Sequence, residues 1–228
     1  MMLQIVPVSS FPGAVILFWI TGIAALLFGL FLLLDFIKNK KIHHLLWAIA
    51  FLVVLVAGLV LIFTNEYLLL LSPIVAALAA LIPGGIAAGL YFVVFEGKTK
   101  LYGYIYLLFI LVMVVLIGIT KAVGSPGASA TVMIAHIPSS LSIILLPIYT
   151  TYKTKDTDWK ALLITIGGII ISIAGLLLAV FTLNPDLALL TLILTLLPIL
   201  LLLSAIFFAF GMLLPEKWSF AIPGIKKK

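Results

Sequence analysis

The segment LLWAIAFLVVLVAGLVLIFT, residues 45–64, decides the kind of fold that this chain adopts, because it carries no charged side chain along its whole length. A helix of about twenty apolar residues crosses a hydrocarbon core about 30 Å thick. The whole chain has the same character, since 65% of its 228 residues are hydrophobic and only 9% are charged. A soluble domain carries roughly 25% charged residues, so the sequence predicts a chain that folds in lipid.

Six further apolar runs lie on either side of this segment. With it they predict seven transmembrane helices, at residues 14–37, 45–64, 67–95, 101–120, 130–152, 159–181 and 187–214. The first run lacks the positive flank and cleavage site of a signal peptide, so we expect it to be retained. Continuous apolar runs differ from the alternating strands of a barrel. The expected fold class is therefore all-α, a polytopic membrane protein with a single seven-helix transmembrane domain over residues 1–228.

The lysines orient these helices. All thirteen basic residues are lysine, and twelve of them flank one set of alternate connections or belong to the carboxyl-terminal tail, whereas only Lys121 belongs to the other set. Cytoplasmic loops carry the excess of basic residues. We therefore expect an amino terminus outside and a carboxyl terminus in the cytoplasm of a multi-pass plasma-membrane protein. The same lysines are expected to attract anionic membrane lipids.

Composition also excludes several classes of function. The chain has no arginine for bidentate contacts to bases or phosphates, so nucleic acid is not an expected partner. It has no cysteine, which removes disulfides and thiolate metal sites. The acidic residues all lie at or beyond the ends of the runs, whereas ion pumps need ionisable relays inside the membrane. We expect no cofactor or metal, and an intramembrane enzyme stays as a third alternative that lacks its usual carboxylates or metal ligands.

Prolines and glycines inside the runs predict bends and close contacts. Pro83, Pro138 and Pro198 each lie within an apolar run, and a proline inside a helix displaces the preceding turn. Gly85 and Gly89 have the GxxxG spacing that lets two helix backbones approach closely. We expect ordinary helix packing at these glycines; the alternative is a docking face for a partner membrane protein or a second copy of the chain.

A candidate polar pocket is built around His136, the only histidine inside an apolar run. Helical spacing places Ser139 and Ser140 near its face. The hydroxyls of Thr191 and Thr195, in the last run, are candidates to line the same path. Together these five side chains predict a site for a weakly polar ligand. The alternative is that each of them bonds to its own helix.

Other histidines and tyrosines are interpreted as parts of the membrane surface. His43 and His44 lie in a lysine-rich connection, where we expect solvated side chains. They would then lie on the opposite side of the membrane from His136, which excludes a three-histidine metal site. Tyr67 and Tyr106 are interpreted as anchors in the membrane interface, and the alternative for Tyr106 is a hydrogen bond into the bundle.

Two pairs of short segments indicate an internal repeat. AGLVLIFTN at 57–65 resembles AGLLLAVFTLN at 174–184, and FIKNK at 36–40 resembles TYKTK at 151–155. A duplication would make the first three and the last three helices parallel repeats joined by the fourth. Composition bias alone is the other explanation, and both stay open.

In helix number, chain length and orientation the sequence resembles the SWEET and PQ-loop carriers and, more loosely, the opsin-like group. That resemblance implies a three-plus-one-plus-three transporter fold. The residue signatures of these families are missing. The only glutamine is Gln4, the three asparagines lie in connections, and residues 187–214 contain no lysine for a retinal Schiff base.

Two functions are carried forward as hypotheses. The first is a transporter-like bundle for a small, weakly polar or amphiphilic solute. The second is a noncatalytic membrane sensor or scaffold that binds lipid or partner membrane proteins. The middle of the bundle separates them: a cavity joining His136, Ser140 and Thr195 favours the transporter, and a tightly packed middle favours the scaffold.

Overall fold

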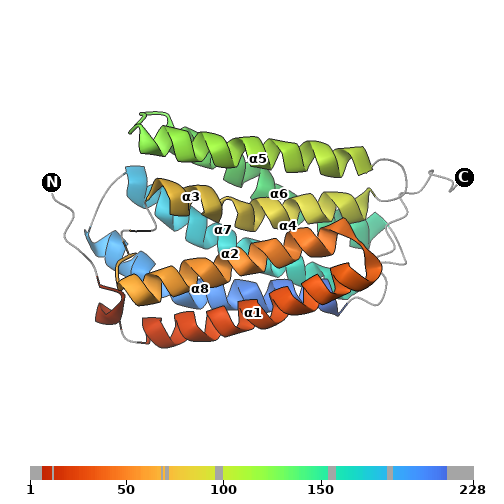
Figure 1. The fold of residues 1–228 in the computed structure, drawn as a ribbon, viewed down its shortest axis with the longest axis horizontal. Helices are drawn as coiled ribbons and strands as arrows, with labels where there is room; N and C mark the ends of the chain where they lie inside the picture. Colours follow the sequence, from red (N-terminus) through yellow and green to blue (C-terminus); the bar gives the residue numbers. More distant parts are fainter. Residues whose placement is uncertain are drawn as a thin grey trace, which may run out of the picture.

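The structure is a computed structural model that describes residues 7–11, 13–67, 69, 72–95, 100–153, 158–183 and 187–214. Within this part of the chain all regular elements are helices, and Figure 1 shows the long ones lying along one common direction. In order they are the 3-10 helix η1 (Val8–Ser10), α1 (Ala14–Asn39), α2 (Ile42–Thr64), α3 (Pro73–Ala79), α4 (Leu81–Val94), α5 (Lys100–Ala122), α6 (Ala128–Lys153), the 3-10 helix η3 (Trp159–Ala161), α7 (Leu162–Leu183) and α8 (Leu187–Leu213).

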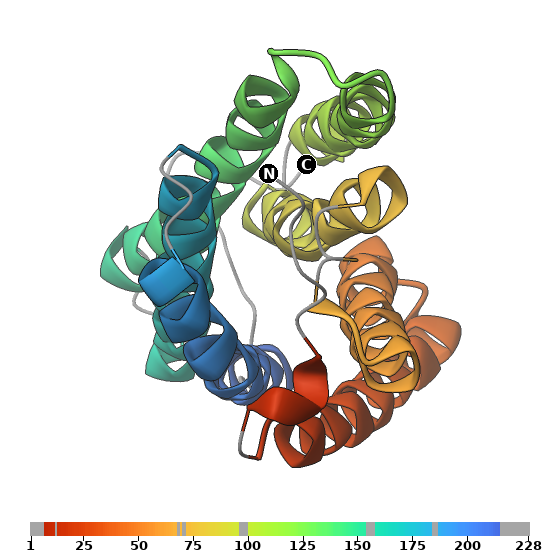
Figure 2. The ribbon, with the colours of Figure 1, turned by 90° about the vertical axis from the view of Figure 1, so that its left-hand side faces the viewer.

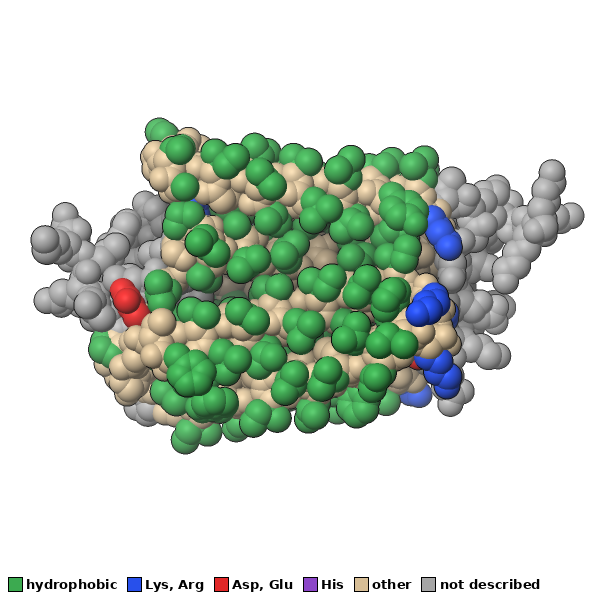
Figure 3. Space-filling view, in the orientation of Figure 1, with side chains coloured by type: hydrophobic (Ala, Val, Ile, Leu, Met, Phe, Trp, Pro, Cys, Tyr) green, Lys and Arg blue, Asp and Glu red, His purple; other side chains and the backbone are tan. Residues whose placement is uncertain are grey.

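Seven helical spans of the described chain are long and apolar enough to cross a membrane, with α3 and α4 counted together as one span. Their outward side chains are apolar as well: Leu108 is 63% exposed and Leu176 is 65% exposed. Figure 3 shows hydrophobic side chains covering the face of the molecule between its two ends. An apolar surface of this extent belongs against lipid or another protein. The predicted all-α, seven-span fold class is confirmed.

The two ends of the bundle differ in charge. α1, α4 and α6 end, and α2, α5 and α7 begin, at one end, as Figure 1 shows. We call this the lysine-rich end, because it holds the described lysines Lys38, Lys40, Lys41, Lys100, Lys153 and Lys160. The opposite, lysine-poor end holds Lys121 and η1. Lys98, Lys155 and the tail lysines lie outside the described residues.

The third span begins later than the sequence predicts, and it is broken once. We expected a helix from residue 67, but α3 begins at Pro73. Its start is fixed by Ser72, whose hydroxyl accepts a hydrogen bond from the Val75 amide at 3.3 Å, and by proline at the first position, where no amide partner is needed. A turn at Ala80 then separates α3 from α4. Pro83 lies just beyond it, and its missing amide weakens the turn that precedes it.

Two other prolines predicted to mark bends lie inside uninterrupted helices. Pro138 lies in α6, which also contains Pro147, and Pro198 lies in α8. A proline within a helix leaves the carbonyl four residues earlier without its helical donor. The bends themselves stay predictions.

Six of the spans close a ring. α1 packs on α2, α2 on α4, α4 on α6, α6 on α7, α7 on α8, and α8 packs back on α1. α5 lies outside this ring against α3, α4 and α6, which the end-on view in Figure 2 shows. The main core inside the ring includes Trp47, Phe51, Leu90, Ile143, Ile164 and Phe208.

Glycines bring α2 and α4 close together. A Cβ at Gly85 would lie 3.2 Å from the Leu46 carbonyl oxygen, and a Cβ at Gly89 would overlap the indole of Trp47. The Trp47 indole donates a hydrogen bond to the Ile86 carbonyl at 3.1 Å. The GxxxG face is therefore covered by α2 of the same chain, which leaves it no room to dock a partner helix.

Candidate functional site

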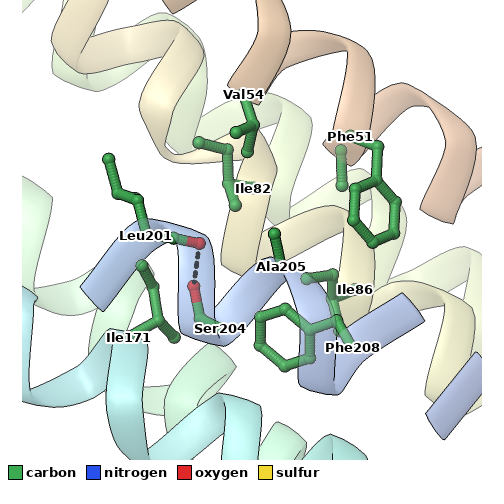
Figure 4. Close-up of a pocket in the computed structure, with 10 residues that line it drawn as sticks. Phe51, Val54, Ile82, Ile86, Ile171, Leu201, Ser204, Ala205 and Phe208 are labelled. Carbon is green, nitrogen blue, oxygen red and sulfur yellow. Dashed lines mark hydrogen bonds between the residues drawn. The ribbon is translucent and has the colours of Figure 1, made fainter. Parts of the chain in front are cut away.

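A small cavity lies inside the ring, between α2, α4, α7 and α8. Its volume is about 20 Å³, which is room for about one water molecule. Figure 4 shows the side chains around it, among them Phe51, Ile86, Ile171 and Phe208. The only side-chain polar group of the lining is the Ser204 hydroxyl, which donates to the Leu201 carbonyl at 2.9 Å. The cavity is therefore apolar, and its one hydroxyl is already bonded.

The structure does not bring the five predicted pocket residues together around this cavity. His136, Ser139 and Ser140 lie on α6, which packs on α4, α5 and α7. Thr191 and Thr195 are exposed on α8, which packs on α7 and α1, and the Thr195 hydroxyl donates to the Thr191 carbonyl at 2.8 Å. None of the five lines the cavity.

His136 is bonded within its own helix. Its Nδ1 lies 3.1 Å from the Val132 carbonyl oxygen, one turn earlier in α6. This nitrogen is the donor in that pair, because a carbonyl only accepts. The geometry matches the alternative weighed from the sequence, in which the imidazole bonds to its own backbone.

Ser139 belongs to a different polar group, between α4, α5 and α6. Its side chain is fully buried and lies 2.9 Å from the hydroxyl of Tyr106. Because Ser139 donates its single proton to the Ala135 carbonyl at 2.7 Å, Tyr106 is the donor to Ser139. The structure shows the alternative weighed for Tyr106, a hydrogen bond into the bundle: its hydroxyl joins α5 to α6.

A second tyrosine completes this group. Tyr91 of α4 stacks on the ring of Tyr106 with 4.6 Å between ring centroids. The Tyr91 hydroxyl lies 3.3 Å from the hydroxyl of Ser142, which donates to the Pro138 carbonyl at 2.7 Å. These four side chains bond one another and their own helices, so they attach the outer helix α5 to the ring.

Another hydrogen bond between distant segments lies near the lysine-poor end. Tyr67 is 2% exposed, and its hydroxyl donates to the Leu194 carbonyl of α8 at 3.1 Å. Leu194 precedes Pro198 by four residues, so its carbonyl is the one that Pro198 leaves without a helical donor. Burial raises the pKa of Tyr67 to about 12, which keeps the phenol neutral and able to donate. The interpretation of Tyr67 as an interfacial anchor missed this contact.

The amino-terminal segment is fixed beside the same hydrogen bond. The Ser9 amide donates to the Asn65 side-chain carbonyl at 2.9 Å, and the Asn65 amide group donates to the Ser9 hydroxyl at 3.1 Å. Val8 is fully buried in a cluster with Phe18, Tyr67 and Leu194. The short helix η1 therefore covers the lysine-poor end of α1, α2 and α8.

His43 and His44 are buried, which corrects the expectation that they are solvated. They are 5% and 9% exposed, because α2 begins at Ile42 and places both in its first turn. The His44 imidazole contacts the Asp35 carboxylate of α1. Asp35 also accepts a hydrogen bond from Asn39 at 2.6 Å. Polar contacts of Asp35 with His44 and Asn39 thus hold the two helix ends together at the two-residue turn between α1 and α2.

The described residues contain no group of three histidines, cysteines or carboxylates that could hold a metal ion. Comparison with known proteins finds no matching family model, no matching curated protein and no matching solved structure. The fold and the apolar surface define the class of the chain, a polytopic helical membrane protein.

Proposed function

We propose that this chain is a noncatalytic membrane sensor or scaffold that acts on lipid or on partner proteins within the bilayer. The observation that carries the proposal is the packed middle of the ring. The cavity inside the ring is apolar and about 20 Å³ in volume. None of the five candidate pocket residues lines this cavity, so the cavity does not join His136 to Thr195.

The polar side chains of the bundle support the same proposal. Ser139, Tyr106, Ser142 and Tyr67 all have partners inside the chain. Leaving a buried polar group unpaired costs about 1–3 kcal/mol. A solute that competed for these groups would have to replace several bonds at once, which favours a structural role for them.

The test compares solute flux with native association. The chain is purified from its own membrane in lipid nanodiscs for native mass spectrometry, and the same sample is reconstituted in liposomes with a panel of small amphiphilic solutes. We expect a lipid or membrane-protein partner retained in fixed stoichiometry and no flux above empty liposomes. Flux of any solute that is abolished by Ala205→Leu, which fills the cavity, would overturn the proposal. His136→Ala is the matched control, because His136 does not line the cavity.

The second candidate is the transporter-like bundle for a small, weakly polar or amphiphilic solute. It is favoured by the position of the cavity between α2 and α4 on one side and α7 and α8 on the other. In a three-plus-one-plus-three repeat, the seam of α4 with α6 is equivalent to the seam of α8 with α1, and both seams are packed. Rocking of one triplet against the other would enlarge the cavity between them.

We also propose that the lysine-rich end faces the cytoplasm of a plasma membrane. The charge difference between the two ends supports this orientation. The chain has no native cysteine, so Lys40→Cys and Val123→Cys can each be labelled alone with an impermeant reagent on intact cells. We expect labelling of Val123→Cys only. Labelling of Lys40→Cys alone would reverse the orientation.

A further inference from the structure

Pro198 leaves one carbonyl of α8 without a hydrogen-bond donor from the helix itself. α8 runs from Leu187 to Leu213 with Pro198 inside it. Pro198 has no amide hydrogen, so the Leu194 carbonyl has no helical partner. Leu194 is 3% exposed, and a backbone group buried at this depth needs a donor from elsewhere.

The missing hydrogen bond is supplied by Tyr67, which belongs to a distant part of the chain. Its hydroxyl donates to the Leu194 carbonyl across 127 positions of sequence. Tyr67 lies between α2 and α3, outside the long helices. The rings of Phe11 and Phe18, with centroids 5.4 Å and 6.1 Å away, hold its ring in place.

The segment that carries Tyr67 is held in place by hydrogen bonds to the amino-terminal residues. Asn65, at the end of α2, has a left-handed backbone with φ of 54° and bonds Ser9 through both its side-chain groups. The Val8 amide donates to the Asn65 carbonyl at 3.2 Å. The end of α2, Tyr67 and η1 therefore form one block against which the first half of α8 packs.

The other half of α8 is fixed differently. Gly211 lies so close to α7 that a Cβ there would come within 2.7 Å of the Ile164 amide nitrogen. Between this contact and Pro198 lie Leu201, Ser204 and Ala205, which line the central cavity. Pro198 therefore separates two halves of α8. The first half is held by the hydrogen bond from Tyr67, and the second half, which includes the cavity-lining residues, packs closely on the backbone of α7.

We infer that the Tyr67 hydroxyl is a latch on a proline hinge in α8. While the latch is made, residues 187–197 stay against α1 and η1, and the cavity is closed from the lysine-poor end. When the hydrogen bond breaks, that half of α8 tilts away at Pro198 and the cavity opens to the same end. This gives the molecule two states, whether it acts as a sensor, a scaffold or a carrier.

The latch is tested by the chemical accessibility of the cavity. Because the chain lacks cysteine, Ser204→Cys places a single thiol of nearly the same size in the lining. The variant is reconstituted in liposomes, and a membrane-impermeant thiosulfonate reagent is added to the outside. Val123→Cys, 71% exposed in the connection between α5 and α6, reports the fraction of molecules with the lysine-poor end outward.

Tyr67→Phe removes only the donor oxygen. We expect it to raise the labelling rate of Ser204→Cys by about five- to tenfold, the population shift that corresponds to losing one buried hydrogen bond. Tyr91→Phe is the matched control, because it removes a phenol oxygen from the α4–α6 joint and leaves Leu194 bonded. The control should label at the parent rate.

Pro198→Ala separates the latch from a general loss of packing. It returns an amide hydrogen to position 198, so Leu194 regains its helical donor and Tyr67 is no longer needed. We expect Pro198→Ala to bring the labelling rate of Tyr67→Phe down to the parent value or below it. An unchanged rate in Tyr67→Phe, an equal increase in Tyr91→Phe, or no rescue by Pro198→Ala would overturn the latch.

A second measurement covers the case in which Tyr67→Phe does not fold. Pro198→Ala alone, with Tyr67 intact, removes the hinge and should lower the labelling rate of Ser204→Cys severalfold below the parent. An unchanged or higher rate would show that the cavity opens by another route, and the latch would be rejected.

Discussion

The helices α6 and α8 both contain internal prolines, and the hydrogen bonds beside Pro138 and Pro198 have different partners. Around Pro138, the hydroxyls of Ser139 and Ser142 donate to carbonyls of α6 itself. At Pro198 of α8 the donor comes from Tyr67, 127 positions away. The Leu194 carbonyl of α8 depends on a donor from another segment. If the proposed latch is correct, this half of α8 is the part of the bundle that moves.

The contacts that anchor the two helices against α7 should show the largest difference. A Cβ at Gly211 of α8 would press on the backbone of Ile164, whereas a Cβ at Gly168 of α7 would press on the Ile143 side chain of α6. Backbone yields less than a side chain, so Gly211→Ala should lower the free energy of unfolding by about 3 kcal/mol and Gly168→Ala by about 1 kcal/mol.

Thermal unfolding of both variants in the same detergent gives the measurement. Gly175→Ala is the control, because a Cβ there meets nothing within 4 Å, and its midpoint should match or exceed that of the parent. Equal losses for Gly211→Ala and Gly168→Ala would mean that the two helices are anchored alike.

Tyr67→Phe should have the next largest effect. It leaves the Leu194 carbonyl buried without a donor, at a cost of about 2 kcal/mol. The double variant with Pro198→Ala should recover most of this loss, because the helix then bonds its own carbonyl. A double-mutant cycle by chemical denaturation measures the coupling. Strictly additive losses of unfolding free energy would show that Tyr67 and Pro198 are not coupled. The comparison between α8 and α6 would then fail.

Ser139→Ala should cost less than the loss of the Tyr67 hydroxyl. The Ala135 carbonyl keeps its helical partner, and only Tyr106 loses an acceptor, so we expect about 1 kcal/mol by thermal unfolding. Ser129→Ala, at an exposed position in the first turn of α6, is the control and should be neutral. A larger loss of stability for Ser139→Ala than for Tyr67→Phe would mean that α6 depends more than α8 on a hydrogen bond to another segment.

The smallest effect is spectroscopic. Tyr67 has a pKa raised to about 12 by burial, against about 10 for an exposed tyrosine. The folded state therefore holds this proton more tightly, so its contribution to stability is complete below about pH 10 and is lost as pH rises through about 12. The difference in ultraviolet phenolate absorbance between parent and Tyr67→Phe isolates this titration. A difference spectrum that appears near pH 10 would mean that Tyr67 is exposed and the latch open.

The seven spans could be predicted because lipid demands about twenty apolar residues for each crossing. The late start of α3 was also readable, since Ser72 followed by Pro73 is a helix-start signal, but the apolar residues before it concealed the signal. His43 was misplaced because we began α2 at the first long apolar run. The spacing of His43, Trp47 and Ala50 along one helix face already indicated that the helix starts earlier.

The joints between helices were harder to predict. Sequence shows that Pro198 frees the Leu194 carbonyl, but it does not show which hydroxyl reaches it. Ser139 and Tyr106 were each singled out and then assigned to different roles. Pairing them requires the packing of α5 on α6, which depends on the whole bundle and leaves no local pattern.

The turn between α1 and α2 has a consequence for how the chain enters the bilayer. Only Lys40 and Lys41 separate the two helices, and two residues extend at most about 7 Å. The start of α2 therefore lies directly beside the end of α1, and the two helices form one antiparallel hairpin. We expect this pair of helices to enter the bilayer together.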